Sequence, residues 1–150
     1  MKPGPERDLL ARYMDRAAKA GRSLGISKVG VTEIPESRNP TVQGRKGDES
    51  QELIAALPPG ASLIMLDETG EDLASAAIAG EIRKALESGV PELAFAIGGP
   101  DGHGEAIRSR ATKTIRFGRA TWPHQIVRIM LTEQLYRAVT ILAGHPYHRE

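Results

Sequence analysis

Apolar residues recur along this chain with two different spacings, which predict helices in some segments and strands in others. Between residues 4 and 21, Leu9, Tyr13 and Ala17 are four positions apart and share one face, so this segment is predicted to be an amphipathic helix. The segment 123–144 has a proline in its first turn and a glycine at its end, as helices prefer. Further helices are predicted at residues 48–57, 71–89 and 104–111.

Two other segments, 61–70 and 91–102, contain continuous apolar runs that end in turn-forming residues. Such runs are typical of strands that are buried on both faces of a parallel sheet. Residues 114–122 are predicted to form a strand followed by a loop, and the alternating, β-branched residues 28–34 to form another strand. The charged stretch 35–50, with two prolines and two glycines, is predicted to be a long, mobile loop. Because strands alternate with helices, we predict an α/β fold with a mostly parallel sheet flanked by helices.

The longest predicted helix, 123–144, has a wide apolar surface. One stripe contains Val127, Leu131, Leu135, Val139 and Leu142, and it is widened by Ile126, Met130 and Ile141. A surface of this width can be buried within one domain, or a second subunit can cover part of it. The pattern leaves both arrangements open.

The chain has 150 residues, which predicts a single domain over residues 1–150 with room for a sizeable core. It contains no cysteine, so disulfides, thiolate metal sites and cysteine nucleophiles are excluded. No apolar run approaches the ~20 residues of a membrane span, and the N-terminus lacks the apolar stretch of a signal peptide. We therefore expect a cytoplasmic protein with no membrane partner.

The net charge is only +1, but the basic residues are unevenly spread. Residues 101–150 hold eight Lys or Arg against four Asp or Glu, and they also hold all four histidines. A basic C-terminal third can bind phosphate, or it can simply be a solvated surface. Within the long helix, Glu133 and Arg137 are four positions apart, the spacing of a surface ion pair.

The second apolar run continues into a glycine-rich turn, FAIGGPDGHG at residues 95–104. In parallel α/β sheets, ligands bind beyond the carboxyl ends of the strands, which is where Gly98 and Gly99 lie. Glycine lets a ligand approach the backbone, because it has no side chain. The pattern is neither the G-x-G-x-x-G fingerprint of dinucleotide-binding proteins nor a P-loop. The turn therefore indicates either a ligand site or a simple reversal of the chain.

The other polar residues form no familiar catalytic pattern. A serine hydrolase needs a G-x-S-x-G elbow, which the sequence lacks. His145 and His148 are three positions apart, but His103 and His124 are distant from them in sequence, so no metal site is predicted.

Three segments taken together, FAIGGPDG, WPHQIVRIMLTEQLYRA and the terminal HPYHRE, resemble the ribosomal RNA large subunit methyltransferase H family. This family belongs to the SPOUT superfamily of knotted methyltransferases. The order and spacing of the segments match, and RNP, GRKGDESQELIAAL and LDETGEDLAS fit the middle of the family as well. The similarity covers nearly the whole chain and is strongest over residues 93–150.

The resemblance implies a small homodimeric enzyme that uses S-adenosylmethionine as its methyl donor. The family methylates N3 of a pseudouridine in large-subunit (23S) ribosomal RNA, and it acts on the assembled ribosome. The implied fold is α/β with a C-terminal trefoil knot, which no periodicity predicts and which is rare among proteins. The alternatives are a methyltransferase that acts on another RNA, such as transfer RNA, and a non-catalytic ribosome- or RNA-binding module of the same fold.

The positions that match the family pattern imply three segments that hold the cofactor. Leu66 ends a strand and is expected to lie against the adenine, while Gly98 and Gly99 bring backbone close to the nucleoside. The third segment is a loop that consists of Phe117, Gly118, Arg119, Ala120, Thr121 and Trp122. Two strand ends and a loop before a helix are also where the residues alone place a nucleoside.

The resemblance also gives the terminal HPYHRE a catalytic role. Tyr147 is expected to stack on or hydrogen-bond to the flipped base, His148 to take its proton directly or through water, and Arg149 to bind a phosphate or a base oxygen. Without the resemblance, a frayed, solvated terminus is the simpler interpretation. Some of the basic residues that follow the glycine turn are expected to face RNA phosphate: Arg108, Arg110, Lys113, Arg116 and Arg119.

The N-terminus departs from the family pattern. The family begins with an apolar strand ahead of the KPGPE helix, whereas Met1 falls directly before that helix here. The first strand of the sheet is therefore expected to be missing, through a late start codon or a true truncation, which leaves a sheet edge or ladder unpaired. The segments that form the expected site lie downstream of it.

Overall fold

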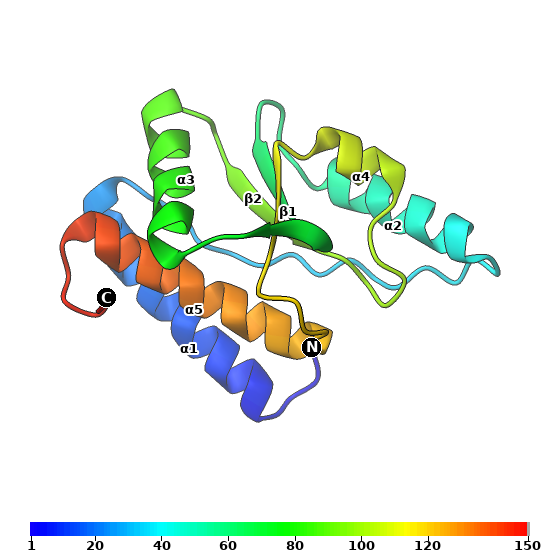
Figure 1. Ribbon diagram of the computed structural model, residues 1–150, viewed down its shortest axis with the longest axis horizontal. Coiled ribbons are helices and arrows are strands. Elements are labelled where there is room, and N and C mark those ends of the chain that lie inside the picture. Colours follow the sequence, from blue (N-terminus) through cyan, green and yellow to red (C-terminus); the bar gives the residue numbers. More distant parts are fainter. Residues whose placement is uncertain (150) are drawn as a thin grey trace. The chain divides into compact units, whose positions relative to one another are not determined.

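The chain divides into two compact units in a computed structural model that describes residues 1–149 (Figure 1). The first unit contains residues 1–31, residues 73–87 and the chain from residue 125 onward. The second contains residues 32–72 and 88–124. Each unit is therefore built from segments that are far apart in the sequence.

The second unit is built on three parallel strands in the order β2-β1-β3. Strand β1 (Ser62–Asp72) lies in the middle, between β2 (Leu93–Ile97) and β3 (Lys113–Arg116). The four residues from Leu63 to Leu66 are all buried, so β1 is covered on both faces, as its continuous apolar run predicts. The predicted α/β class and parallel sheet are thereby confirmed.

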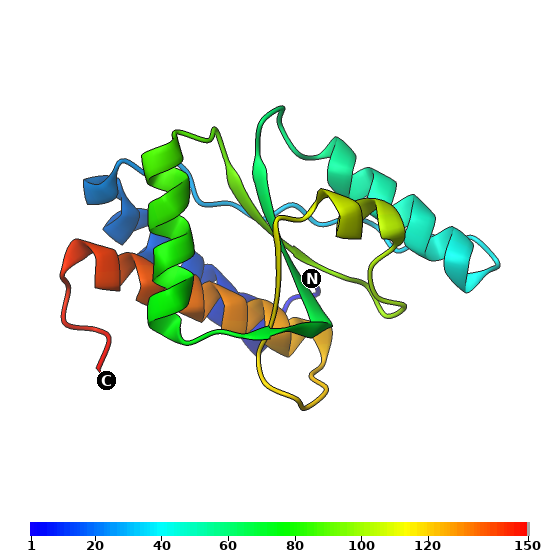
Figure 2. The same ribbon diagram turned by 45° about the horizontal axis from the view of Figure 1, so that its top comes forward.

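Two helices pack on one face of this sheet. They are α2 (Val42–Ala55) and α4 (Glu105–Arg110), which lie side by side in both ribbon views (Figure 1, Figure 2). Leu63 and Met65 are two positions apart on β1 and so point to the same face. The core on that face contains Leu63, Met65, Ala96 and Ile107, with Leu53, Ile54, Leu57, Ala94 and Ala111 packed around them.

The first unit is helical. Its elements are α1 (Pro5–Gly21), the 3-10 turn η1 (Arg22–Leu24), α3 (Ser75–Ser88) and α5 (His124–Ala143). Helices α1 and α5 run alongside each other in both views, and the ring centroids of Tyr13 and Tyr136 lie 6.4 Å apart. The Ser75 hydroxyl donates to Gln134 Oε1 at 2.7 Å, which ties α3 to α5.

The predicted strand at residues 28–34 is wrong. The chain is irregular from residue 26 to residue 39, and no segment of residues 1–149 pairs with it as a strand. Alternating β-branched residues favour a strand only where a neighbour can accept and donate the backbone hydrogen bonds. The strand propensity of residues 28–34 was therefore not sufficient to make this segment a strand.

The predicted loop over residues 35–50 is too long, because α2 begins at Val42 rather than near residue 48. Thr41 is the N-cap of this helix, and its hydroxyl accepts a hydrogen bond from the Gly44 N–H at 2.9 Å. The glycines and charges of this stretch are typical of a loop. Threonine, however, is a residue type that commonly precedes a helix, so Thr41 indicates the start of α2 in the sequence.

Strand β1 passes the same residue of β3 twice. Leu66 and Glu71 both pair with Ile115, so residues 67–70 form a detour out of the ladder. Gly70 lies against the Ile115 backbone, where an added Cβ atom would come within 2.5 Å of the Ile115 carbonyl carbon. Any other residue would have to push the two strands apart.

Gly70→Ala is therefore expected to destabilise the fold by about 1–3 kcal/mol, because backbone cannot move away as a flexible side chain can. Urea denaturation would show this as a lower midpoint with an unchanged slope. Gly80→Ala is the matched control, since Gly80 is exposed on α3 with nothing within 4 Å of its added Cβ. This control is expected to gain about 0.5–1 kcal/mol. Equal midpoints for Gly70→Ala and the wild type would contradict the close approach.

Candidate functional site

The prediction that Leu66 ends its strand is wrong, because β1 continues to Asp72 and Leu66 is only the last residue before the detour. The register of the sheet nevertheless sets Leu66 level with the ends of β2 and β3. Leu66 on β1 pairs with Ile97 on β2 and with Ile115 on β3. Because the strands are parallel, the segments that follow them leave the sheet at one edge. Gly98 follows β2 directly, and the loop that starts at Phe117 follows β3 directly. The three segments that the sequence singled out for a cofactor thus begin at a common edge of the second unit.

The glycine turn is a tight reversal. The Gly102 N–H donates to the Gly99 carbonyl at 2.9 Å, and these two residues form an isolated antiparallel bridge. Gly102 has a φ of 86°, in the left-handed region that glycine occupies without strain. A Cβ atom on Gly98 would come within 3.1 Å of the Gly102 carbonyl carbon. The turn therefore closes as tightly as it does because residue 98 has no side chain.

Helix α2 fastens this turn from the side. Arg45 forms an ion pair with Asp101, with Nε 2.7 Å from Oδ2, and the Ser50 hydroxyl accepts a hydrogen bond from the Gly104 N–H at 2.9 Å. The hydrogen bond from Arg45 lowers the pKa of Asp101 below its ordinary value, so this carboxylate stays charged at neutral pH. These contacts could not be predicted from the sequence, because the predicted loop over residues 35–50 includes Arg45 and Ser50.

His103 connects the turn to the central strand. It is only 3% exposed, and its Nε2 atom lies 3.0 Å from the Leu66 carbonyl oxygen. A carbonyl can only accept, so Nε2 carries the proton and Nδ1 is the bare nitrogen. Within the described residues, no group hydrogen-bonds to Nδ1. Burial lowers the pKa of His103, so the ring is neutral at neutral pH.

His103 is expected to make the fold less stable in mild acid. Burial holds its folded-state pKa below the 6.5 of an unperturbed histidine, although the hydrogen bond to Leu66 and the charge of Asp67 oppose the shift. The unfolded chain therefore takes up the proton first, and the free energy of unfolding decreases as the pH falls below about 6.5 toward the folded-state pKa. His103→Gln keeps an amide N–H near the position of Nε2 and does not titrate. Urea denaturation at several pH values is expected to show a weaker acid loss in His103→Gln, whereas parallel pH profiles would contradict this.

Hydrogen bonds fix both ends of the loop after β3, and the residues between these ends are exposed to solvent. The Trp122 Nε1–H donates to the Phe117 carbonyl at 3.0 Å, and the Gly118 N–H donates to Asp72 Oδ1 at 3.2 Å. Residues 119–121 are exposed, and the Trp122 side chain is 44% exposed despite its size. The loop thus offers peptide groups and one aromatic ring to a ligand.

An ion pair forms at the start of the β1 detour, directly after Leu66. Asp67 accepts from Arg108 of α4 through two hydrogen bonds, at 2.9 and 3.2 Å. Burial raises the pKa of Asp67, but hydrogen bonds from Arg108 and Thr69 outweigh it and lower the pKa to about 2. Asp67 is therefore charged throughout the physiological pH range and holds the Arg108 guanidinium in an ion pair.

Most of the basic residues expected to face RNA phosphate have partners within the chain. Arg119 is exposed, and its charge adds to the hydrogen bond from Arg116 in lowering the pKa of Asp72. The partners of the other four are Asp67 for Arg108, the Ala61 carbonyl for Arg110, Glu71 for Lys113 and Asp72 for Arg116. Contact between these four and phosphate stays a prediction, and it would have to compete with these bonds.

The C-terminal residues pack against α5 in the first unit. The Tyr147 hydroxyl donates to Glu133 Oε1 at 3.1 Å, and its ring centroid lies 4.5 Å from that of Tyr136. Arg137 Nη1 lies 3.2 Å from His148 Nδ1. Burial, with help from Glu133, raises the pKa of Tyr147 to about 12, so its hydroxyl stays protonated. At these two positions the tail is half-buried rather than frayed.

The predicted site residues fall into two groups. Leu66, Gly98, Gly99 and residues 117–122 all belong to the second unit, whereas Tyr147, His148 and Arg149 belong to the first. Arg149 is exposed. Among the described residues, no cluster of His, Asp and Glu side chains could hold a metal ion. None of the helices in residues 1–149 has the length and apolar character needed to cross a membrane.

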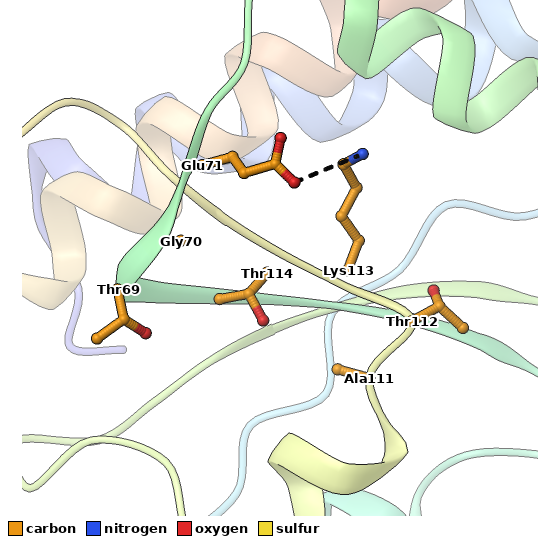
Figure 3. Close-up of a pocket in the computed structure, with 7 residues that line it drawn as sticks. All are labelled: Thr69, Gly70, Glu71, Ala111, Thr112, Lys113 and Thr114. Carbon is orange, nitrogen blue, oxygen red and sulfur yellow. Dashed lines mark ion pairs between the residues drawn. The ribbon is translucent and has the colours of Figure 1, made fainter.

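An open depression lies beside the detour of β1, and its lining includes none of the predicted cofactor residues (Figure 3). The lining comes from the detour and from the chain that enters β3: Thr69, Gly70, Glu71, Ala111, Thr112, Lys113 and Thr114. Glu71 Oε1 and Lys113 Nζ form an ion pair at 4.0 Å. This lining is mostly polar and open, unlike the enclosed, apolar sites that small molecules prefer.

Comparison with known proteins shows what this chain resembles over nearly its whole length. Residues 1–148 match a family described as "Predicted SPOUT methyltransferase". A protein of Brucella anthropi is 56% identical over 149 residues, which cover 99% of this chain and 93% of the relative. One of Brucella abortus (strain S19) is 54% identical over 158 residues, covering 99% and 94%, and one of Chelativorans sp. (strain BNC1) is 51% identical over 150, covering 100% and 86%. All three relatives are named ribosomal RNA large subunit methyltransferase H.

Proposed function

Because this chain belongs to the SPOUT methyltransferase family, it is a methyltransferase, and we propose that it methylates ribosomal RNA. In finer terms, it transfers a methyl group from S-adenosylmethionine to N3 of a pseudouridine in the large-subunit (23S) RNA of the assembled ribosome. The names of the relatives support the RNA substrate. The resemblance of GGPDG and HPYHRE to the family pattern supports the finer assignment, including the C-terminal trefoil knot.

The convergence of three segments at one sheet edge is the observation that carries this function. The register sets Leu66 between Ile97 and Ile115, so the glycine turn and the loop after β3 start at the same edge of the sheet, one on each side of β1. The site must present hydrogen-bonding backbone to the edge of an adenine and a slot for its flat ring. The turn without side chains at Gly98 and Gly99 and the exposed peptide groups of the loop over residues 117–122 fit the first of these needs.

The residues present therefore fit an adenosyl group, and Leu66, Gly98, Gly99 and the loop would hold it. When bound, S-adenosylmethionine supplies a methyl group that is already activated on a sulfonium sulfur. The protein's part is mainly to hold the acceptor nitrogen in line with that group, and such orientation can contribute about 7–11 kcal/mol to catalysis. Arg45 and Ser50 serve this purpose by fastening the turn to α2.

The C-terminal residues are proposed to contact the target base. Its N3 must lose a proton, so negative charge develops on the pyrimidine as the methyl group arrives. Arg149 is exposed and carries a guanidinium, which suits contact with an RNA phosphate or a base oxygen. Hydrogen bonds to Glu133 and Arg137 of α5 hold Tyr147 and His148 in place, and their side chains are proposed to contact the base.

We also propose that the enzyme acts as a homodimer in the cytoplasm, where its ribosomal substrate is found. A chain of 150 residues offers little surface for RNA, and a dimer would let one subunit hold the cofactor while the other binds the base. On the wide apolar surface of α5, Leu131 and Val139 are buried, whereas Ile126 is 37% exposed. Analytical ultracentrifugation at assay concentration tests this, and a fully active monomer would contradict it.

Methylation of ribosomes that lack the modification tests the proposed function. With radiolabelled S-adenosylmethionine, we expect up to one methyl group per ribosome, on a pseudouridine N3 when the digested RNA is mapped by mass spectrometry. Label in transfer RNA instead would favour the alternative substrate. Binding of ribosomes without binding of S-adenosylmethionine in calorimetry would favour a non-catalytic module.

A further inference from the structure

Two residues of α5, Glu133 and Arg137, hold the side chains of Tyr147 and His148. Arg137 donates to Glu133 Oε1 from Nε at 3.0 Å and from Nη2 at 2.5 Å, the ion pair that the spacing predicts. The same carboxylate oxygen accepts the Tyr147 hydroxyl at 3.1 Å. The Arg137 guanidinium also lies over the Tyr147 ring, 4.9 Å from its centroid. This leaves Nη1, which lies 3.2 Å from His148 Nδ1.

A guanidinium has only hydrogen-bond donors, so Arg137 determines which nitrogen of His148 is bare. Nδ1 must offer its lone pair to Nη1, and the proton of the neutral ring is then on Nε2. Among residues 1–149, no group pairs with Nε2, so the ring presents an N–H donor to an approaching molecule.

We propose that Arg137, supported by Glu133, is a positioning residue that makes His148 a hydrogen-bond donor to the target base rather than the acceptor of its proton. This inference rests on the proposed function, because it concerns the base that is methylated. It revises the role expected of His148 from the sequence, while keeping it among the residues that touch the substrate.

A donor suits the chemistry of the acceptor nitrogen. When N3 loses its proton, the negative charge spreads to the neighbouring carbonyl oxygens, where a fixed N–H stabilises it. The N3 proton passes to water. The new N3–methyl bond then forms as the sulfur–methyl bond breaks, and the electron pair of that bond stays on sulfur. Tyr147 cannot take the N3 proton, because its hydroxyl keeps its own proton and donates to Glu133.

Nitrogen NMR of protein labelled with ¹⁵N-histidine tests the first part, because protonated and bare ring nitrogens have well-separated chemical shifts. The His148 signals are identified by their absence from the His148→Gln variant. We expect bare Nδ1 and protonated Nε2 in the wild type at pH 8. In Arg137→Met, which removes the donors, we expect a mixture of both tautomers. Protonated Nδ1 in the wild type would overturn the proposal.

Methylation kinetics test the second part. Arg137→Met is expected to lower kcat about ten- to hundredfold with little change in KM for ribosomes, since the loss is of a charged hydrogen bond that orients the donor. Arg137→Lys retains a donor and is expected to recover part of the activity. Arg83→Met is the matched control, because Arg83 is exposed on α3, and it is expected to behave as the wild type.

Unchanged kcat in Arg137→Met would overturn the positioning role. Circular dichroism and urea denaturation show whether that variant is folded, and Arg137→Lys decides the question if it is not. Failure of the wild type to methylate any RNA would instead contradict the proposed function. The two failures are distinguishable, since the tautomer of His148 is read without any substrate.

Discussion

His148→Ala is expected to lower the rate of ribosome methylation about 100- to 1000-fold, because removing a fixed donor from developing negative charge has effects of that size in enzymes. Binding of S-adenosylmethionine is expected to stay unchanged, since His148 is bonded to Arg137 and not to any of the predicted cofactor residues. Single-turnover methylation measures the first quantity, and isothermal titration calorimetry measures the second.

His148→Gln separates the two roles that this histidine can have. A glutamine amide N–H can reach close to the position of Nε2 and can donate, but it cannot take up a proton. If His148 is a donor, His148→Gln is expected to retain activity within about tenfold of the wild type, since much of one hydrogen bond is preserved. A glutamine variant as inactive as the alanine variant would show that His148 acts as a proton acceptor, and it would contradict the donor role.

Gly98→Ala is expected to weaken the binding of S-adenosylmethionine about ten- to hundredfold, which corresponds to the cost of overpacking a closed turn. The added Cβ atom would lie 3.1 Å from the Gly102 carbonyl carbon and 3.3 Å from the His103 nitrogen. The turn must open by a few tenths of an ångström, which would displace the backbone that is expected to approach the nucleoside. Calorimetry measures the dissociation constant.

Gly47→Ala is the matched control for this substitution. Gly47 lies within α2, and nothing is found within 4 Å of its added Cβ atom. It is expected to leave the dissociation constant unchanged. Urea denaturation of both variants shows whether a loss of binding comes from the site or from unfolding. Wild-type affinity in a folded Gly98→Ala variant would mean that the turn only reverses the chain.

The sequence was most informative where a pattern is decided locally. The four-residue spacing of Leu9, Tyr13 and Ala17 predicted α1, which extends from Pro5 to Gly21. The apolar runs predicted two parallel strands, and both are present. The prediction that both are buried holds for β1 from Leu63 to Leu66 but is wrong for β2, an edge strand in which only Ala96 is buried. The strand ends then located the glycine turn and the loop after β3 at one edge of the sheet.

It was least informative where the outcome depends on a distant partner. Residues 28–34 have the composition of a strand, but a strand requires a second chain segment to bond with, and no described segment provides it. In the sequence, the detour at residues 67–70 is marked only by two acidic residues and a glycine. Gly70 is needed there because of the Ile115 backbone, which is far away along the chain.

The same limit applies to single polar side chains. His103 has no sequence signal for its role, since its partner is the Leu66 carbonyl, 37 positions away. Glu133 and Arg137 were recognisable as an ion pair from their spacing alone. The same pair also bonds to Tyr147 and His148. These bonds form only because the tail folds back on α5, and no pattern in the sequence predicts that fold.

Titration of the ¹⁵N-labelled protein with S-adenosylmethionine, followed residue by residue through its backbone amide signals, tests the cofactor site most directly. We expect the largest shifts at Leu66, at Gly98 and Gly99, and along residues 117–122, with little change at the amides of the open depression in Figure 3. Shifts that gather around Thr69 and Thr112 instead, with the glycine turn unaffected, would contradict the site.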